Sequence, residues 1–328
     1  MTDLQVIVSV VIFSVVIITI AFDILDLALA GLLGVSGLIV FGIVQLDDVT
    51  RIIRASGATF ALLFGGMVVA RTLGPTGIFE FLGDFYLRKT GGSGKRLLLG
   101  LVMLVAPLCV FLPNATTVLL LAPVVVRVCR VLEIDVVPPL ILTAVISNSA
   151  GLLTLVGDPA TFLVGSSINM TFVQYLYRVA PGGLMILLVV VSLLPWIMKD
   201  VWNKKFVLPA DLKPRSLQHV ALAALALGVL LLMILLFLFG DGLPVPIAPA
   251  AASIVACSLA LLVIQGMAVE PVGDVLRDID WKTMVFLACM FILVEAFTKT
   301  GLLHKFGGLL SQSFGSNLVA AAWFCLEE

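Results

Sequence analysis

Long apolar segments alternate with short polar ones along the whole of this chain of 328 residues. Most of the apolar segments are roughly twenty residues long, which is the length at which a helix crosses a hydrocarbon core of about 30 Å. The pattern predicts an all-α, polytopic membrane protein. We expect uninterrupted spans over residues 4–22, 27–44, 57–72, 178–198, 217–239, 247–265 and 281–297, and the start of another near 317.

Two further apolar segments, 97–132 and 138–168, are interrupted in their middle by short polar stretches. Lipid cannot hydrogen-bond a bare backbone, so a helix that stops at membrane depth must be buried in protein or must line a cavity. In transporters such breaks form ion or substrate sites. We expect such a site here at the two breaks, 114–117 and 147–159, where Asn114, Thr116, Thr117 and Asp158 carry polar side chains.

The segment 97–132 is expected to form a re-entrant hairpin with its tip at Pro113-Asn114. Its predicted arms, 97–111 and 115–126, would extend for about 22 and 18 Å at 1.5 Å per residue, which is short of a full crossing. We expect Asn114 to cap the second arm. Amide, hydroxyl and carbonyl oxygens at this tip suit a small cation such as Na⁺, whereas the simpler alternative is a kinked buried helix that Asn114 only caps.

The segment 138–168 is expected to be a broken helix that restarts at Asp158-Pro159. A carboxylate at the cap position followed by proline at the first helical position is a strong helix start. Asp158 is also an ionisable group near membrane depth, so it is our proton-coupling candidate. The alternative is that Asp158 only caps its own helix. A Na⁺ ion would have Asn114 and Asn148 as its expected amide ligands.

An internal repeat is visible when residues 76–83 are laid on residues 300–307, a shift of 224. An odd number of crossings in each half predicts inverted repeats, a common transporter architecture. We expect a first repeat over 1–198, a cytoplasmic linker over 199–216 and an incomplete second repeat over 217–328. The second repeat is expected to be truncated, because the counterpart of the Asn114 hairpin tip would fall beyond Glu328.

Composition agrees with a membrane protein, since 61% of the residues are hydrophobic, 12% are charged and the mean hydropathy is +1.22. Such values exclude a soluble domain of this size. With the N-terminus outside, most of the 19 basic residues fall inside, among them those of segments 88–96 and 199–215; this agrees with the positive-inside rule. We find no nucleophile and base pair, phosphate loop or metal-ligand spacing, so we expect no enzyme. A bacterial inner membrane is the expected location.

Two motifs, FLPNATTVLLLAPV from Phe111 and SNSAGLLTLVGDPATFLVGSS from Ser147, resemble those of the ArsB/NhaD permeases. This group belongs to the ion transporter superfamily, has citrate transporter-like relatives and includes the P protein of melanosomes. The resemblance implies an inverted-repeat transporter that works as a homodimer by an elevator-like motion. It also implies a site made of Asn114, Thr116, Thr117, Ser147, Asn148, Gly157, Asp158 and Pro159. The chain departs from the pattern at Pro113, where relatives often have an acid, at Ser149-Ala150-Gly151, where they are richer in glycine, and at Ala160, where a second proline is frequent.

The leading hypothesis is a secondary active transporter of small inorganic ions, either a Na⁺/H⁺ antiporter or an exporter of arsenite or silicate. No cofactor is expected beyond Na⁺ or H⁺ as the coupling ion. One alternative is a di- or tricarboxylate carrier, which needs cationic side chains or helix N-termini to hold its anion; neither motif contains Lys or Arg. Another alternative is a truncated membrane protein that does not transport.

Overall fold

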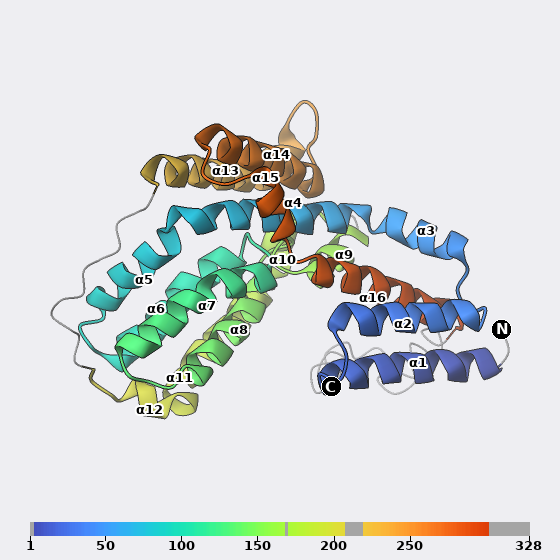
Figure 1. Cartoon of the computed structure of the whole chain (residues 1–328), viewed down its shortest axis with the longest axis horizontal. Coiled ribbons are helices and arrows are strands. Elements are labelled where there is room, and N and C mark those ends of the chain that lie inside the picture. The colour runs from blue at the N-terminus through green and yellow to red at the C-terminus, as the bar shows by residue number, and fades with distance from the viewer. Residues whose placement is uncertain (1–2, 168–169, 207–218, 302–328) are drawn as a thin grey trace. The chain divides into compact units, whose positions relative to one another are not determined.

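The computed structural model describes residues 3–167, 170–206 and 219–301, and within them all regular elements are helices (Figure 1). Seven helices in this part of the chain are long and apolar enough to cross a membrane. The prediction of an all-α, polytopic membrane protein is thus confirmed. These seven are α1 (Asp3–Ala21), α4 (Gly57–Leu73), α7 (Asn114–Val131), α11 (Ala180–Ile197), α13 (Val220–Phe239), α14 (Pro249–Met267) and α16 (Trp281–Lys299). The predicted span 27–44 is wrong in length, because the helix there, α2 (Leu27–Val40), ends after 14 residues and is too short to be among them.

Shorter helices connect these apolar ones, and the hydropathy pattern did not predict them. They contain too many charged residues to stand out by apolar length, as in α3, whose first turn holds Asp47 and Asp48 and whose last turn holds Arg54. Charges placed in this order stabilise the two ends of the helix dipole. The short helices are α3 (Leu46–Ala55), α5 (Ile78–Lys89), α10 (Phe172–Arg178), α12 (Lys199–Trp202) and α15 (Val272–Arg277).

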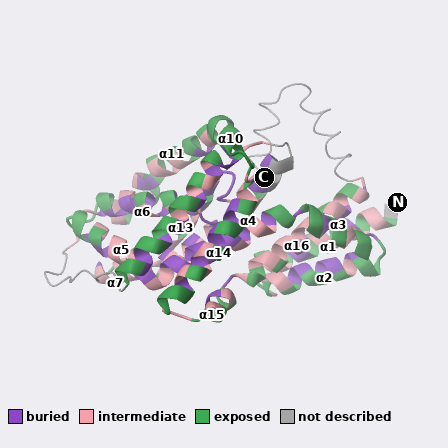
Figure 2. Cartoon of the chain, turned by 90° about the horizontal axis from the view of Figure 1, so that it is seen from above, coloured by how far each residue is buried: buried purple, intermediate pink, exposed green. Residues whose placement is uncertain are grey.

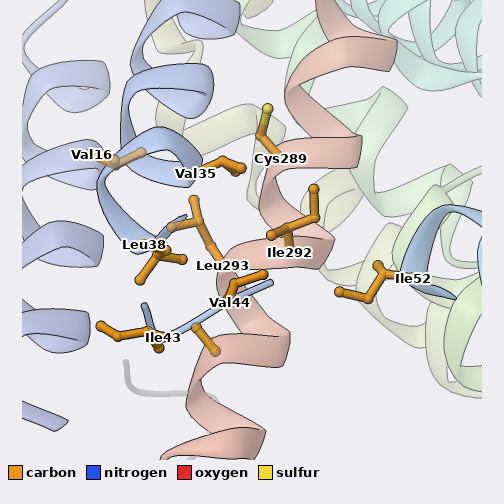
Figure 3. Close-up of a cluster of buried hydrophobic side chains, with 10 residues drawn as sticks. Val16, Val35, Leu38, Ile43, Val44, Ile52, Cys289, Ile292 and Leu293 are labelled. Atoms are coloured by element: carbon orange, nitrogen blue, oxygen red, sulfur yellow. The ribbon is translucent and has the colours of Figure 1, made fainter. Parts of the chain in front are cut away.

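The described chain divides into two compact units, one formed by residues up to 57 together with those from 280 onwards, and the other by residues 58–279. In the first unit α16 packs against α2, and α1 covers α2. Figure 3 shows their shared core, in which Val16, Leu38 and Leu293 point toward one another. A Cβ at Gly31 would lie 2.9 Å from the Cβ of Cys289, so the small residue sets how closely α2 and α16 approach.

Ion pairs join α3 to the C-terminal end of α16 in the first unit. Arg51 of α3 pairs with Glu295 at 2.6 Å, and Asp48 pairs with Lys299. The hydrogen bond from Lys299 holds the pKa of Asp48 below its ordinary value. A carboxyl group with a lowered pKa stabilises the fold above its unfolded pKa and loses that contribution as the pH falls. The pair between Asp48 and Lys299 therefore stabilises the contact of α3 with α16 at neutral pH and loses this contribution only in acid.

In the second unit α4 crosses α14 with almost no side chain between the two backbones. Figure 2 shows α4 largely in the colour of buried residues. The Ser253 hydroxyl donates to the Ala61 carbonyl at 3.1 Å, and a Cβ at Gly65 would lie 2.4 Å from the Ser253 carbonyl oxygen. Small residues allow this close packing, as they do at membrane helix interfaces in general.

Gly65→Ala is expected to destabilise the protein because its methyl group meets backbone, which cannot turn aside. Gly266→Ala is the matched control, since Gly266 also lies in this helix pair but has no atom within 4 Å of its Cβ position. The control should be neutral or stabilising by up to about 1 kcal/mol from helix propensity. The melting temperatures of the two variants, measured by thermal unfolding in detergent, check this prediction. Equal melting temperatures for the two variants would contradict the contact.

The shift of 224 residues relates α2, α3 and α4 to α14, α15 and α16 in the same order. It also relates Gly77 to Gly301, which follow α4 and α16, and both have φ of 72°. Left-handed backbone at these two positions favours glycine. The repeat boundaries at 1–198, 199–216 and 217–328 stay a prediction. Most of residues 300–307, on which the repeat was first seen, lie outside the described residues.

Candidate functional site

The first break separates α6 (Gly94–Cys109) from α7 (Asn114–Val131). These helices have 16 and 18 residues, so the expected second arm of 115–126 was too short. Helix α7 continues past Val126 because Arg127 pairs with the buried Asp84 of α5 at 3.0 Å instead of ending the apolar segment. Of the two arms, only α6 is therefore too short to cross, as a re-entrant arm would be, since α7 is among the helices long enough to cross.

Asn114 does not cap α7, contrary to expectation. It is the first residue of the helix, the cap position is Pro113, and Pro113 makes no side-chain cap hydrogen bond. The Asn114 side chain instead lies beside Gly151, which immediately precedes the second break, and a Cβ at Gly151 would come within 2.4 Å of it. The amide is therefore free to bind across the two breaks.

The second break separates α8 (Val137–Gly151) from α9 (Pro159–Ser167). Asp158 accepts hydrogen bonds from the Ala160 amide at 3.0 Å and from the Thr161 amide at 3.3 Å, so its carboxylate caps α9. Within the break the Thr154 hydroxyl accepts from the Gly157 amide at 3.2 Å. The interruption of 138–168 is thus a turn of seven residues, 152–158, between two helices.

Hydrogen bonds join the two breaks directly. With its amide oriented so that the nitrogen donates, Asn114 reaches the carbonyl oxygen of Ser147 at 3.1 Å and that of Gly157 at 3.2 Å. In return, the Ser147 hydroxyl donates to the Asn114 carbonyl at 3.3 Å. The Thr154 hydroxyl donates to the Val110 carbonyl at the end of α6. The breaks therefore form one connected polar region inside an apolar surrounding.

Backbone also packs against backbone at this junction. A Cβ at Gly157 would lie 2.6 Å from the Cys109 carbonyl oxygen and 2.7 Å from the Gly151 Cα. The Cys109 thiol donates to the Ser147 hydroxyl at 3.1 Å. Thr154, Cys109 and Gly151 are functional candidates that the sequence reasoning did not place in the site. Only Gly151 had a signal, as a glycine within a long apolar helix.

The expected site residues fall into two groups. Asn114, Ser147 and Gly157 lie at the junction itself, and the hydroxyls of Thr116 and Thr117 are buried on the first turn of α7 without a hydrogen-bond partner among the described residues. Asp158 and Pro159 lie at the start of α9 and are half-buried. Asn148 is exposed on α8, so the structure does not bring it to Asn114.

The chemistry available at the junction is that of oxygen donors. The residues in and next to the two breaks, 110–117 and 147–159, include one carboxylate, Asp158, and no Lys or Arg. No group of three or more His, Cys, Asp or Glu side chains with metal-ligand geometry occurs within the described residues. Hydroxyls without a hydrogen-bond partner, and backbone carbonyls where a helix is interrupted, can bind a weakly held alkali cation or a neutral solute that carries hydroxyl groups.

Comparison with known proteins agrees with the superfamily that the two motifs indicated. Residues 14–326 match the citrate transporter family, CitMHS. An uncharacterized transporter of Synechocystis is 36% identical over 311 residues, which cover 95% of this chain and 69% of that protein. An uncharacterized transporter of Mycobacterium tuberculosis is 28% identical over 98% of this chain and 74% of its own length.

The human P protein is 30% identical over 196 residues, which cover 57% of this chain and 23% of the P protein. This match confirms the resemblance to the permease group that includes the P protein. The chain spans between 64% and 74% of the length of its bacterial transporter relatives. Because the family match covers nearly the whole chain and both breaks, the chain belongs to the citrate transporter family of integral membrane transporters.

Proposed function

We propose that this protein is a secondary active transporter of a small inorganic ion, and that the ion binds where the two helix breaks meet. The observation that carries the proposal is the bridge from the Asn114 amide to the carbonyls of Ser147 and Gly157. It fixes two interrupted helices together at a point rich in oxygen atoms. Interrupted helices of this kind supply the ion ligands of many secondary transporters.

Unsatisfied oxygens beside the bridge support a bound ion. Leaving a buried hydroxyl without a hydrogen bond costs about 1–3 kcal/mol. The hydroxyls of Thr116 and Thr117 are both in that condition. A Na⁺ ion, or the hydroxyl groups of arsenite or silicate, would satisfy them during transport. We therefore propose Na⁺/H⁺ antiport or efflux of such a weak acid as the activity.

The hydrogen bonds across the junction also support an elevator-like mechanism. Asn114, Ser147 and Thr154 together connect α6 and α7 to both sides of the second break. Any motion of one break must then carry the other, which is what a transport domain that moves as a rigid body requires. Assembly as a homodimer and residence in a bacterial inner membrane are parts of the same proposal.

Asp158 is proposed to exchange the ion for a proton. Its carboxylate caps α9 through Oδ2, and its charge lies at the half-buried edge of the junction. Asn caps helices as well as Asp does, so Asp158→Asn removes the charge and keeps the cap. We expect the variant to fold normally and to lose pH-dependent ion flux, measured with labelled sodium or arsenite in proteoliposomes.

Asp135→Asn is the matched control, because Asp135 also hydrogen-bonds a backbone amide at a helix start, that of Val137 at 3.1 Å, but lies away from the junction. The control should transport as the unmodified protein does. An Asp158→Asn protein that transports with unchanged rate and pH dependence would show that Asp158 is a cap and no more.

A di- or tricarboxylate is the second candidate substrate, because the family is that of citrate transporters and two helices, α7 and α9, begin at the junction. Helix N-termini attract carboxylates without any Lys or Arg. Competition of citrate against labelled sodium and arsenite separates the candidates. Uptake of labelled citrate that sodium or arsenite does not displace would favour the carboxylate.

A further inference from the structure

Two basic segments that are far apart in the sequence meet at the N-terminal end of α6. A backbone clip joins them: the Gly94 amide donates to the Lys204 carbonyl at 3.0 Å, and the Phe206 amide donates to the Gly92 carbonyl at 2.7 Å. Helix α12 packs on α6 beside the clip. The segments therefore form one surface, which we call the basic junction. Its basic residues are Arg88, Lys89, Lys95, Arg96, Lys199, Lys204 and Lys205.

The basic junction holds seven positive side chains, all of them exposed. None of the seven makes an ion pair with a described carboxylate. Asp200 is the single acid within the two segments 88–96 and 199–206. Positive side chains that lie close together repel one another when no anion is near. An anionic partner would remove this repulsion.

Aromatic side chains accompany the charges. The Lys95 ammonium lies 5.5 Å from the centre of the Trp202 ring, and the Lys89 ammonium lies 5.8 Å from that of Phe85. Trp and Tyr are concentrated at the boundary between lipid and water, where Lys and Arg also extend toward the headgroups. Such a mixture places the basic junction at the membrane surface, on the side that the positive-inside count makes cytoplasmic.

A groove of about 440 Å³ leads from the basic junction along α6. Lys89 and Arg96 lie at its charged end, and Leu99 and Met103 line its apolar end. Positions 96, 99, 100 and 103 share one helix face. Gly100 lines the groove between its two ends, and a Cβ there would overlap the Tyr86 ring. Met103, at the apolar end, is 74% exposed. The groove thus changes from charged to apolar over about 10 Å of helix.

We propose that the basic junction and this groove bind an anionic phospholipid of the cytoplasmic leaflet. Its phosphate-bearing headgroup contacts the lysines and arginines, and one acyl chain lies along Leu99 and Met103. Basic pockets between membrane helices on this side bind such headgroups in general. The bound lipid holds the N-terminal end of α6 at the membrane surface. This binding does not depend on which ion the protein carries.

Binding of phosphatidylglycerol is measured on the purified full chain, by native mass spectrometry and by exchange of a fluorescent phosphatidylglycerol, with phosphatidylcholine as the reference lipid. Wild-type protein should prefer phosphatidylglycerol. Each Lys or Arg near an anionic lipid contributes about 1 kcal/mol, which is about fivefold in affinity. Lys204→Gln with Lys205→Gln should therefore lower the preference about 25-fold.

Two further variants separate the proposed site from charge alone. Lys204→Arg with Lys205→Arg keeps the charges and should keep the preference, as should Arg54→Gln, which removes an exposed charge elsewhere. Gly94→Ala keeps all seven charges but places a Cβ 1.8 Å from the Val201 carbonyl oxygen, so it should open the clip and reduce the preference. Thermal unfolding in phosphatidylcholine confirms that each variant is folded.

The proposal is overturned by a wild-type protein that binds the two lipids equally, or by a folded Gln double variant that keeps the wild-type preference. A folded Gly94→Ala protein with the full preference would also overturn it, because the clip would then have no part in forming the site. Loss of the preference in Arg54→Gln would show general attraction between net charges and would count against a specific site.

Discussion

Asn114→Ala is expected to abolish ion transport and to destabilise the junction of the two breaks. The substitution removes both donor bonds, to the Ser147 carbonyl at 3.1 Å and to the Gly157 carbonyl at 3.2 Å. A buried carbonyl left without a partner costs about 1–3 kcal/mol. The hydrogen bonds of the Ser147 and Thr154 hydroxyls would still join the two breaks, but the junction would be weakened. Flux in proteoliposomes and thermal unfolding in detergent measure the two effects.

Asn148→Ala is the matched control for this prediction. Asn148 belongs to the same polar stretch as Ser147, but its side chain is exposed on α8 and not at the junction. The control should keep both flux and melting temperature. If Asn148→Ala loses transport while Asn114→Ala keeps it, the ion site lies on the outer face of α8 and the junction is only structural.

Gly157→Ala is expected to have the second largest effect, because backbone surrounds Gly157 at the junction. The added Cβ would lie 2.6 Å from the Cys109 carbonyl oxygen and 2.7 Å from both the Cα and the carbonyl oxygen of Gly151. Real Cβ atoms do not approach backbone so closely, and backbone cannot change rotamer to make room. The breaks must move apart, so transport should fall to background and the melting temperature should drop.

Gly182→Ala serves as the control for Gly157→Ala, since no atom lies within 4 Å of a Cβ at Gly182. It should leave transport and unfolding unchanged. A Gly157→Ala protein with normal flux would mean that the two breaks are not packed together in the transporting protein, and the proposed ion site would have to be given up.

The apolar spans and the two breaks could be predicted from the sequence because both depend on the bilayer. A spanning helix must be apolar over a fixed length, and a polar interruption within it is visible against that background. The helix start at Asp158-Pro159 was also local, since a cap and its proline lie in adjacent positions. Asp158 accepts from Ala160 and Thr161 in the structure as that signal indicated.

The partners of individual side chains could not be predicted in this way. Asn114 was expected to cap its own helix, yet its amide lies against Gly151 and reaches Ser147 and Gly157. The choice between a local cap and a contact more than 30 residues away depends on how helices pack, which no local pattern records. For the same reason no local pattern indicated that Arg127 pairs with Asp84.

By itself, the sequence determined that this protein is a helical membrane protein with breaks near residues 114 and 157, because apolar length and helix-breaking residues are local properties. The motifs at those breaks indicated a transporter through their resemblance to a known family. Only the tertiary structure decided which oxygens meet at those breaks. It also decided that segments 88–96 and 199–206, one hundred residues apart in the chain, form one basic surface. Both results depend on contacts between distant segments, and those follow from close packing of backbone at glycines such as Gly94 and Gly157.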